Sequence, residues 1–195
     1  MGETATRERL IEAAHRSFYR HGFQAVGLDR ILADVGVTKT TFYKYFASKD
    51  ELILAVLRQH DAWWRRTLPE LLREHAGDDP AAQLRAVFDV LEAAVERDDY
   101  RGCIFHTVTV EFPSPTDPAH LAAAENKRGV DRILAALARR AGVATPEAFA
   151  EELGLLVEGM LVVHAVDRSV ASARVAKRTA ALLFARYLQA PVGAG

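Results

Sequence analysis

Apolar residues recur three and four positions apart along most of this 195-residue chain, and this spacing constrains the fold more than any other feature. Residues that favour helices, such as Ala, Leu, Glu and Arg, are abundant, and no segment shows the apolar–polar alternation of a half-buried strand. Half of the residues are hydrophobic, so the chain can bury a substantial core. The sequence therefore predicts an all-α protein.

Three helices are expected at the N-terminus. The first begins at a Thr4 or Thr6 cap and ends at Gly22, because glycine readily takes the left-handed conformation that closes a helix. The second ends at Gly36, and Thr38 can cap a third helix directly after that tight turn. The expected apolar stripes are Leu10, Ile11, Ala14 and Phe18, then Leu28, Ile31, Leu32 and Val35.

A long fourth helix is expected to begin at Ser48, which has the capping-box spacing to Glu51, and to reach about Leu72. Pro69 should kink or split this helix, because proline removes an amide donor and crowds the preceding turn.

Later helix starts share one pattern, a capping oxygen followed by proline at the first helical position. Asp79-Pro80, Asp117-Pro118 and Thr145-Pro146 predict helices over 80–97, 117–141 and 146–167. The segment 102–112 has strand-like propensity, but a lone strand has no partner, so a buried helix is favoured there. A last helix is expected over 171–189, followed by a disordered tail over 191–195.

Composition excludes several classes of protein. Cys103 is the single cysteine, so neither an intramolecular disulfide nor a zinc site with two cysteines can form. No apolar run reaches the length of a membrane helix, and the charged start does not resemble a signal peptide, so a cytoplasmic protein is expected. The net charge is −1, while residues 1–60 carry nine Lys/Arg against seven Asp/Glu, a weak local basic excess.

The segment 36–46 carries the most informative polar residues. Five apolar residues suffice to lock two helices across the Gly36 turn, namely Ile31, Val35, Val37, Phe42 and Phe46. This leaves cationic, hydroxyl and aromatic side chains on the surface. Such side chains can hold phosphate oxygens and reach base edges in the major groove. Helix-turn-helix geometry also occurs as plain packing, so this surface is the feature that favours DNA binding.

The stretch from Gly36 to Phe46, followed by Ser48 to Leu52, resembles the DNA-binding signature of TetR/AcrR-type transcriptional regulators. The resemblance implies a homodimer held mainly by the last two helices, an inducer pocket in the C-terminal part, and repression relieved by ligand. It also places Gly27 where the family usually has a capping Ser or Thr, and Leu32 where it usually has Ala. The positions expected at the DNA are Gly27, Arg30, Thr38, Lys39, Thr40, Thr41, Tyr43, Lys44, Tyr45 and Lys49.

This reading divides the chain into a helix-turn-helix DNA-binding domain over 1–50 and a helical ligand-binding and dimerisation domain over 51–195. The segment 102–112 is nearly uncharged and mixes apolar residues with a few polar ones, which suits a pocket for an apolar effector, although a filled core would look the same. The expected pocket residues are Trp63, Phe88, Leu91, Cys103, His106, Val110 and Glu111.

Two late amphipathic helices are expected to carry more apolar surface than one small core needs, and to pair with a second copy of the chain. The apolar sets of these helices, of which only the excess beyond one core is expected at the subunit contact, are Leu153, Leu156, Val157, Met160, Leu161, Ala181, Leu182, Phe184, Ala185 and Leu188.

Enzyme and metal functions are the alternatives. Cys103 and His106 could form a nucleophile and base, but no third orienting residue accompanies them. His106, Glu111, Glu158 and His164 lack the tight spacing of metal ligands. We therefore expect no catalytic residue, no cofactor and no metal, and interpret the chain as a repressor released from its DNA operator by a small apolar inducer, rather than as an enzyme or a ligand carrier.

Overall fold

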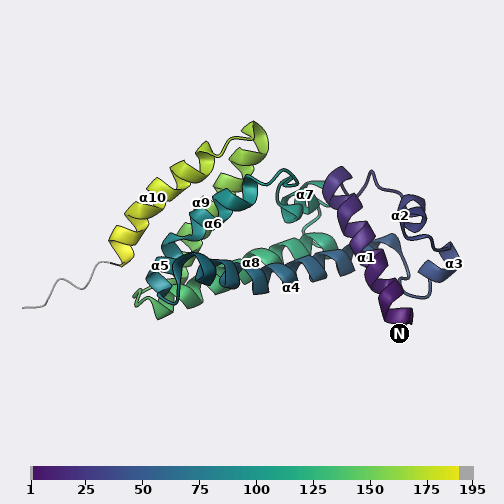
Figure 1. Cartoon of the computed structure of the whole chain (residues 1–195), viewed down its shortest axis with the longest axis horizontal. Helices are drawn as coiled ribbons and strands as arrows, with labels where there is room; N and C mark the ends of the chain where they lie inside the picture. The colour runs from purple at the N-terminus through teal and green to yellow at the C-terminus, as the bar shows by residue number, and fades with distance from the viewer. Residues whose placement is uncertain (1, 189–195) are drawn as a thin grey trace, which may run out of the picture. The chain divides into compact units, whose positions relative to one another are not determined.

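The computed structural model describes residues 2–188, and within this range every regular element is a helix (Figure 1). This confirms the predicted all-α class. The helices are α1 (Gly2–His21), α2 (Leu28–Val35), α3 (Lys39–Phe42), α4 (Lys49–Ala76), α5 (Pro80–Arg85), α6 (Val87–Val95), α7 (Ile104–Glu111), α8 (Pro118–Arg140), α9 (Pro146–Asp167) and α10 (Ala171–Tyr187). None of the helices in this range combines the length and apolar character of a membrane span.

The chain forms two compact units. Unit 1 comprises the described residues as far as Trp63 together with Cys103–Asn126, and unit 2 comprises Trp64–Gly102 and the described residues from Lys127 onward. Both α4 and α8 contribute residues to each unit. The predicted functional division at residue 50 remains a proposal, because compactness alone does not say where a function begins.

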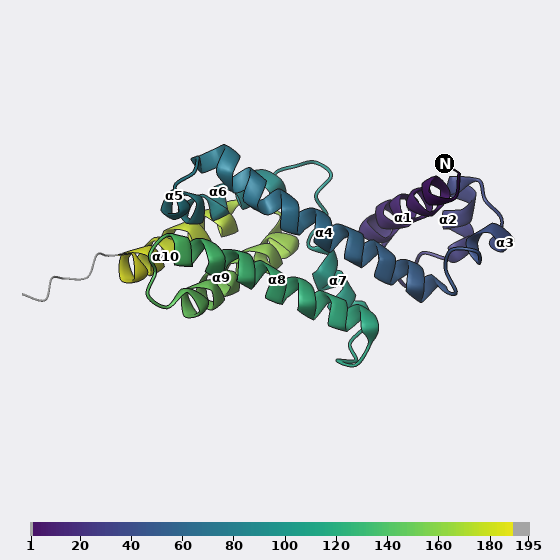
Figure 2. The ribbon, with the colours of Figure 1, turned by 90° about the horizontal axis from the view of Figure 1, so that it is seen from below.

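Unit 1 is built around α1, α2 and α3, which gather beside the start of α4 in both ribbon views (Figures 1 and 2). Its largest buried side chains are aromatic, and α7 adds its apolar face to the same core. The segment 102–112 is therefore helical as predicted, over Ile104–Glu111, but it is packed by one face and is not fully buried. The core includes Leu10, Phe18, Phe23, Val26, Ile31, Phe42, Phe46, Leu52, Ile104, Phe105 and Val108.

Unit 2 is a helical core formed by α5, α6, α9, α10 and the parts of α4 and α8 that belong to it. Four residues of the apolar sets of α9 and α10, namely Leu153, Val157, Met160 and Phe184, are buried in this core. Periodicity identifies an apolar face but not what covers it, and these four cover their own core. The apolar side chains that stay exposed on α9 and α10 are Leu155, Val162, Val163, Val166, Val175 and Leu182.

Several helix boundaries differ from those expected. Helix α1 begins at Gly2 rather than at a threonine cap, and α4 continues through Pro69 to Ala76. Leu68 and Leu72 are buried on either side of Pro69, so packing of both turns in the core of unit 2 outweighs the backbone hydrogen bond that proline removes. The helix expected over 80–97 is two helices that meet at Ala86. The predicted end at 189 and the predicted disordered tail lie outside the described residues.

Candidate DNA-binding interface

A glycine turn sets the angle between α2 and α3. Gly36 takes the left-handed conformation at φ +74°, and its N–H donates to the carbonyl of Leu32 at 2.9 Å. The N–H of Val37 donates to the same carbonyl at 3.1 Å, which satisfies groups that the end of α2 would otherwise leave unpaired. The backbone N–H of Thr41 then donates to the Thr38 hydroxyl at 3.2 Å and caps α3 as predicted.

Helix α3 and the turn after it present a polar surface over a fully buried ring. Phe42 is buried in unit 1 and contacts Phe46 with ring centroids 5.5 Å apart, so the chain cannot rotate about its own axis here without opening the core. Tyr43 is 57% exposed and Lys44 is also exposed. Thr40 shares that exposure, whereas Thr41 and Tyr45 are half-buried. A large aromatic ring held in water beside a cation suits contact with a nucleic acid.

Lys39, one of the cations expected to contact DNA, forms an ion pair within the protein. Lys39 Nζ lies 2.9 Å from Asp29 Oδ1 on α2, and both side chains are largely exposed. The hydrogen bond to Asp29 raises the pKa of Lys39 above its usual range, so this amine stays charged. The pair joins α2 to α3 across the turn, and a phosphate approaching Lys39 competes with the Asp29 carboxylate.

The remaining predicted positions differ in environment. Gly27 caps α2 with extended backbone and no side-chain hydrogen bond, and its Cα faces open space. Arg30 is exposed and its guanidinium lies 3.0 Å from the His21 ring nitrogen Nε2. Lys49 at the start of α4 holds its ammonium 5.9 Å from the centre of the Phe18 ring. The ten predicted residues thus surround the α2–α3 turn and the start of α4, all within unit 1.

Three supporting contacts have no signal in the local sequence. Arg9 on α1 donates to the carbonyl of Val35 at 2.7 Å, and so braces the end of α2. Arg7 places its guanidinium 5.2 Å from the centre of the Phe46 ring. The third contact, made by Glu111, bridges 88 positions of sequence, and no local pattern signals such a pairing.

The seven residues predicted for an effector pocket are distributed over both units. Phe88 and Leu91 are buried in the core of unit 2. The other five belong to unit 1, where Val110 is 78% exposed and both carboxylate oxygens of Glu111 accept backbone hydrogen bonds. Trp63 is 45% exposed, whereas its neighbour Trp64 packs against the core of unit 2. Cys103 and His106 are half-buried.

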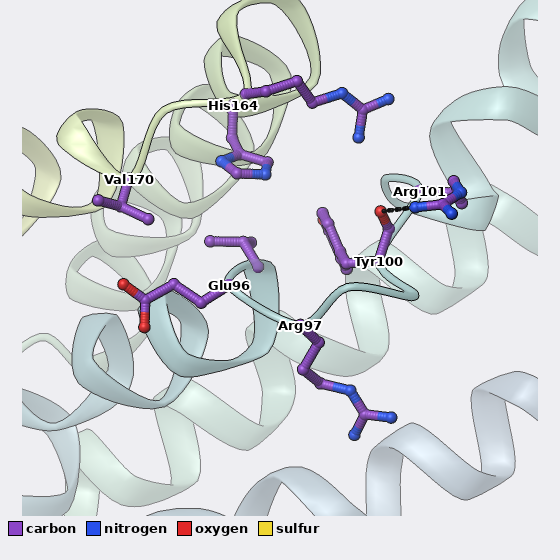
Figure 3. Close-up of a pocket in the computed structure, with 8 residues that line it drawn as sticks. Glu96, Arg97, Tyr100, Arg101, His164 and Val170 are labelled. Atoms are coloured by element: carbon purple, nitrogen blue, oxygen red, sulfur yellow. Dashed lines mark hydrogen bonds between the residues drawn. The ribbon is translucent and has the colours of Figure 1, made fainter.

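Two open cavities lined by the described residues provide space for a small molecule, and none of the seven predicted residues lines either of them. The first, of about 370 Å³, lies in unit 2, where Tyr100 and His164 face it while Glu96 and Arg97 extend away (Figure 3). His164 is held by Ser169, whose carbonyl lies 3.0 Å from Nδ1, and its ring meets Tyr100 edge to face. The Arg97 guanidinium forms an ion pair with Asp99.

The second cavity, of about 310 Å³, lies in unit 1 between α4 and the start of α8. Its walls are mainly apolar with a few charged groups, a mixture that favours an apolar molecule with one or two polar atoms. The lining residues are Leu54, Leu57, Arg58, Asp61, Pro118, Leu121, Ala122 and Glu125. Among the described residues no three His, Cys, Asp or Glu side chains are grouped as a metal site.

Comparison with known proteins places the interface in a family context. Residues 10–56 match the model of bacterial regulatory proteins of the tetR family. The chain is 28% identical over 132 residues to the HTH-type transcriptional repressor NemR of Escherichia coli K12, covering 68% of this chain and 66% of that one. It is 29% identical over 117 residues to the repressor DhaR of Mycobacterium sp. GP1, covering 60% and 57%. These matches span between half and two thirds of the relatives' length.

Solved structures extend the likeness to nearly the whole chain. The TetR-family regulator SCO4454 of Streptomyces coelicolor superposes with a TM-score of 0.85 at 27% identity, covering 95% of this chain and 97% of the other. The reduced form of NemR from E. coli superposes with a TM-score of 0.79 at 23% identity, covering 91% and 96%, which shows a shared fold.

Proposed function

We propose that the chain is a repressor whose dimer binds a pseudo-palindromic operator and is released by a small effector. The proposal builds on the N-terminal motif and the fold, which are those of a DNA-binding, TetR-type transcription regulator. One observation carries the proposal: Tyr43 and Lys44 are exposed beside a buried Phe42 that fixes their direction. In this proposal residues 1–50 read DNA, residues 51–195 bind effector and partner, and the protein acts in the cytoplasm, where bacterial DNA is found.

The ten surface positions around the α2–α3 turn divide by role in this proposal. Thr40, Tyr43 and Lys44 reach base edges and nearby phosphates, because their side chains are exposed. Thr38, Thr41 and Tyr45 hold the segment in shape as well as facing the DNA, because the two threonines form its cap and the Tyr45 ring packs on the core. Gly27, Arg30, Lys39 and Lys49 are assigned to the phosphate backbone of the duplex, where Lys39 has to leave its ion pair with Asp29.

Dimerisation is proposed to use the exposed apolar stripe on α9 and α10. Leu155, Val162 and Val166 follow one another at helical spacing, and Leu155 and Val166 are 73% and 82% exposed. Side chains of this kind are stabilised when a second copy covers them, and a two-fold pair would present two recognition segments to the two half-sites.

The effector is proposed to be a small, mostly apolar molecule, and the cavity between α4 and α8 is the first site to test. It is the more apolar of the two cavities, and α4 also carries Lys49 at its start. Coupling between effector and operator should amount to about 1 to 3 kcal/mol and be reciprocal, so operator DNA should weaken effector binding by the same factor.

The decisive experiment is a gel shift with DNA from the promoter region of the chain's own gene, with an unrelated duplex of equal length as control. Preferential binding to the promoter fragment supports the proposal, and equal binding to both contradicts sequence-specific regulation. Apolar metabolites that raise the melting temperature are then added to the same assay. Ala122→Trp, which would fill the α4–α8 cavity, should abolish their effect while leaving operator binding intact.

A further inference from the structure

Glu111, the last residue of α7, reaches back to the corner between α1 and α2. The backbone N–H of Phe23 donates to Oε1 at 3.1 Å, and the N–H of Gln24 donates to Oε2 at 2.6 Å. Each carboxylate oxygen thus accepts one amide of the corner, across 88 and 87 positions of sequence. A carboxylate is a stronger acceptor for such amides than a neutral group.

The corner needs an external acceptor because of how α1 ends. Gly22 takes the left-handed conformation at φ +83°, and its own N–H still donates to the carbonyl of Phe18 at 2.8 Å. The next two amides turn away from α1, and the Phe23 side chain is fully buried against Phe18 and Phe112. A backbone N–H held in such surroundings needs a partner to replace water.

Gly22 also leaves the space that the carboxylate fills. A Cβ at this position would lie 2.5 Å from Glu111 Oε1, closer than two such atoms can approach. The corner therefore combines a backbone conformation that suits glycine with a close approach in which a Cβ would displace the Glu111 carboxylate. Gly22 and Glu111, which are far apart in the sequence, thus meet in one contact.

We propose that Glu111 is a positioning residue for DNA binding, which fixes the α1–α2 corner and through it the direction of α2 and α3. Five residues separate the corner at Gly22 from α2, whose cap Gly27 offers no side-chain hydrogen bond, so the start of α2 depends on how the corner is held. Gly36 then ties α3 to α2. This inference rests on the DNA-binding role proposed above and extends that role to α7.

The same geometry argues against Glu111 as an effector ligand. Both carboxylate oxygens are engaged by corner amides, so a ligand that hydrogen-bonded to this group would have to compete with Phe23 or Gln24. Val110 beside it points to solvent and has no part in the corner, which makes it a matched control on the same helix.

Hydrogen exchange measured by NMR tests the contact itself, without DNA. In Glu111→Ala the amides of Phe23 and Gln24 should exchange at least about tenfold faster than in the unchanged chain, while the Gly22 amide, bonded to Phe18, keeps its rate. Glu111→Gln should slow one of the two amides again, because its single oxygen can hold one of them. Val110→Ala should change none of the three. Unchanged exchange at both amides in Glu111→Ala would overturn the proposal.

Operator affinity, measured with a duplex selected from a random pool by the unchanged chain, tests the consequence. Glu111→Ala should weaken operator binding about tenfold, unrelated DNA much less, and Glu111→Gln should lie between. Either of two results would show that the corner does not position α2 and α3 for DNA binding. The first is faster exchange without loss of operator affinity, and the second is a Glu111→Gln variant that binds the operator no better than Glu111→Ala. If the unchanged chain selects no duplex, the proposed function fails, while the exchange data still decide whether Glu111 holds the corner.

Discussion

His15 Nε2 lies 3.1 Å from His60 Nδ1, and this contact joins α1 to α4 inside unit 1. The two rings stack with centroids 5.1 Å apart, and Phe105 also lies against His60. The hydrogen bond requires that at least one ring nitrogen accept, so the two imidazoles cannot both be charged and keep it. The contact between α1 and α4 therefore holds at most one protonated ring, and burial lowers the pKa of both rings and favours their neutral forms.

Acidification should destabilise the protein through this pair. Burial, with His15 as a neighbour, lowers the pKa of His60 to about 4, although Asp61 opposes the shift; burial and Arg16 lower the pKa of His15. Because the folded pKa lies below the usual 6.5, the unfolded chain binds more protons between these values, and stability is lost as pH falls from about 6.5 to 4. We expect a loss on the order of 2 to 3 kcal/mol in urea unfolding followed by circular dichroism.

The His60→Phe variant provides the comparison for this pH profile. It should flatten the profile between pH 4 and 6.5, whereas His75→Gln, which alters an exposed histidine of α4, should leave it unchanged. A His60→Phe profile as steep as that of the unchanged chain would assign the acid sensitivity to other groups.

Substitutions around α3 should separate base reading from phosphate binding. Tyr43→Ala should cost about 1 to 3 kcal/mol on the operator and little on random DNA, because an exposed ring that contacts bases carries sequence information. Lys49→Ala should weaken both complexes and reduce the salt dependence by roughly one ion. Fluorescence anisotropy at several salt concentrations measures both. Equal losses of affinity for operator and random DNA in Tyr43→Ala would mean that this segment does not recognise the base sequence.

Release of Lys39 from its internal partner should strengthen DNA binding. Asp29→Asn removes the carboxylate that lies 2.9 Å from Lys39 Nζ, so the ammonium becomes available to a phosphate. We expect tighter binding to operator and random DNA alike, with a salt dependence steeper by up to about one ion. Asp34→Asn, on the same helix and exposed, removes an equal charge without touching Lys39 and controls for net charge. Identical gains from both variants would exclude the pairing as the cause.

A charge in the exposed stripe of α9 should separate the proposed dimer. Val162→Glu places a carboxylate among side chains that a partner would have to desolvate. Light scattering should then fall from twice the chain mass of 21.5 kDa to the chain mass itself. Leu121→Glu, at a position 51% exposed on α8, should leave the mass unchanged. A monomeric mass for the unchanged chain at micromolar concentration would contradict the proposed dimer.

Local chemistry made much of the fold predictable. Gly36 ends α2 in the left-handed conformation that its position implied, and Asp79 and Asp117 accept amide hydrogen bonds at the starts of α5 and α8. These signals act within a few residues, so the sequence displays them directly. The same holds for Ser48, whose hydroxyl accepts from the Glu51 amide at 3.1 Å.

Contacts between distant residues were not predictable in this way. Glu111 looked like a polar group of a pocket because its partners, Phe23 and Gln24, are distant in sequence and offer only backbone amides. The apolar residues of α9 raised a related difficulty. Their spacing marked one apolar set that includes Leu153, and burial alone shows that Leu153 faces its own chain while Leu155, outside that set, is exposed. The surface around α3 was recognisable because its polar side chains break an otherwise apolar pattern.

The exposed stripe on α9 and α10 also bears on how stability is measured. Where two chains cover Leu155 and Val166 between them, folding of unit 2 and association are linked, and mass action makes the unfolding midpoint rise with protein concentration. A stability difference between variants then has meaning only at a stated concentration. Dilution below the dissociation constant would lower the melting temperature of the unchanged chain without altering a single contact within it.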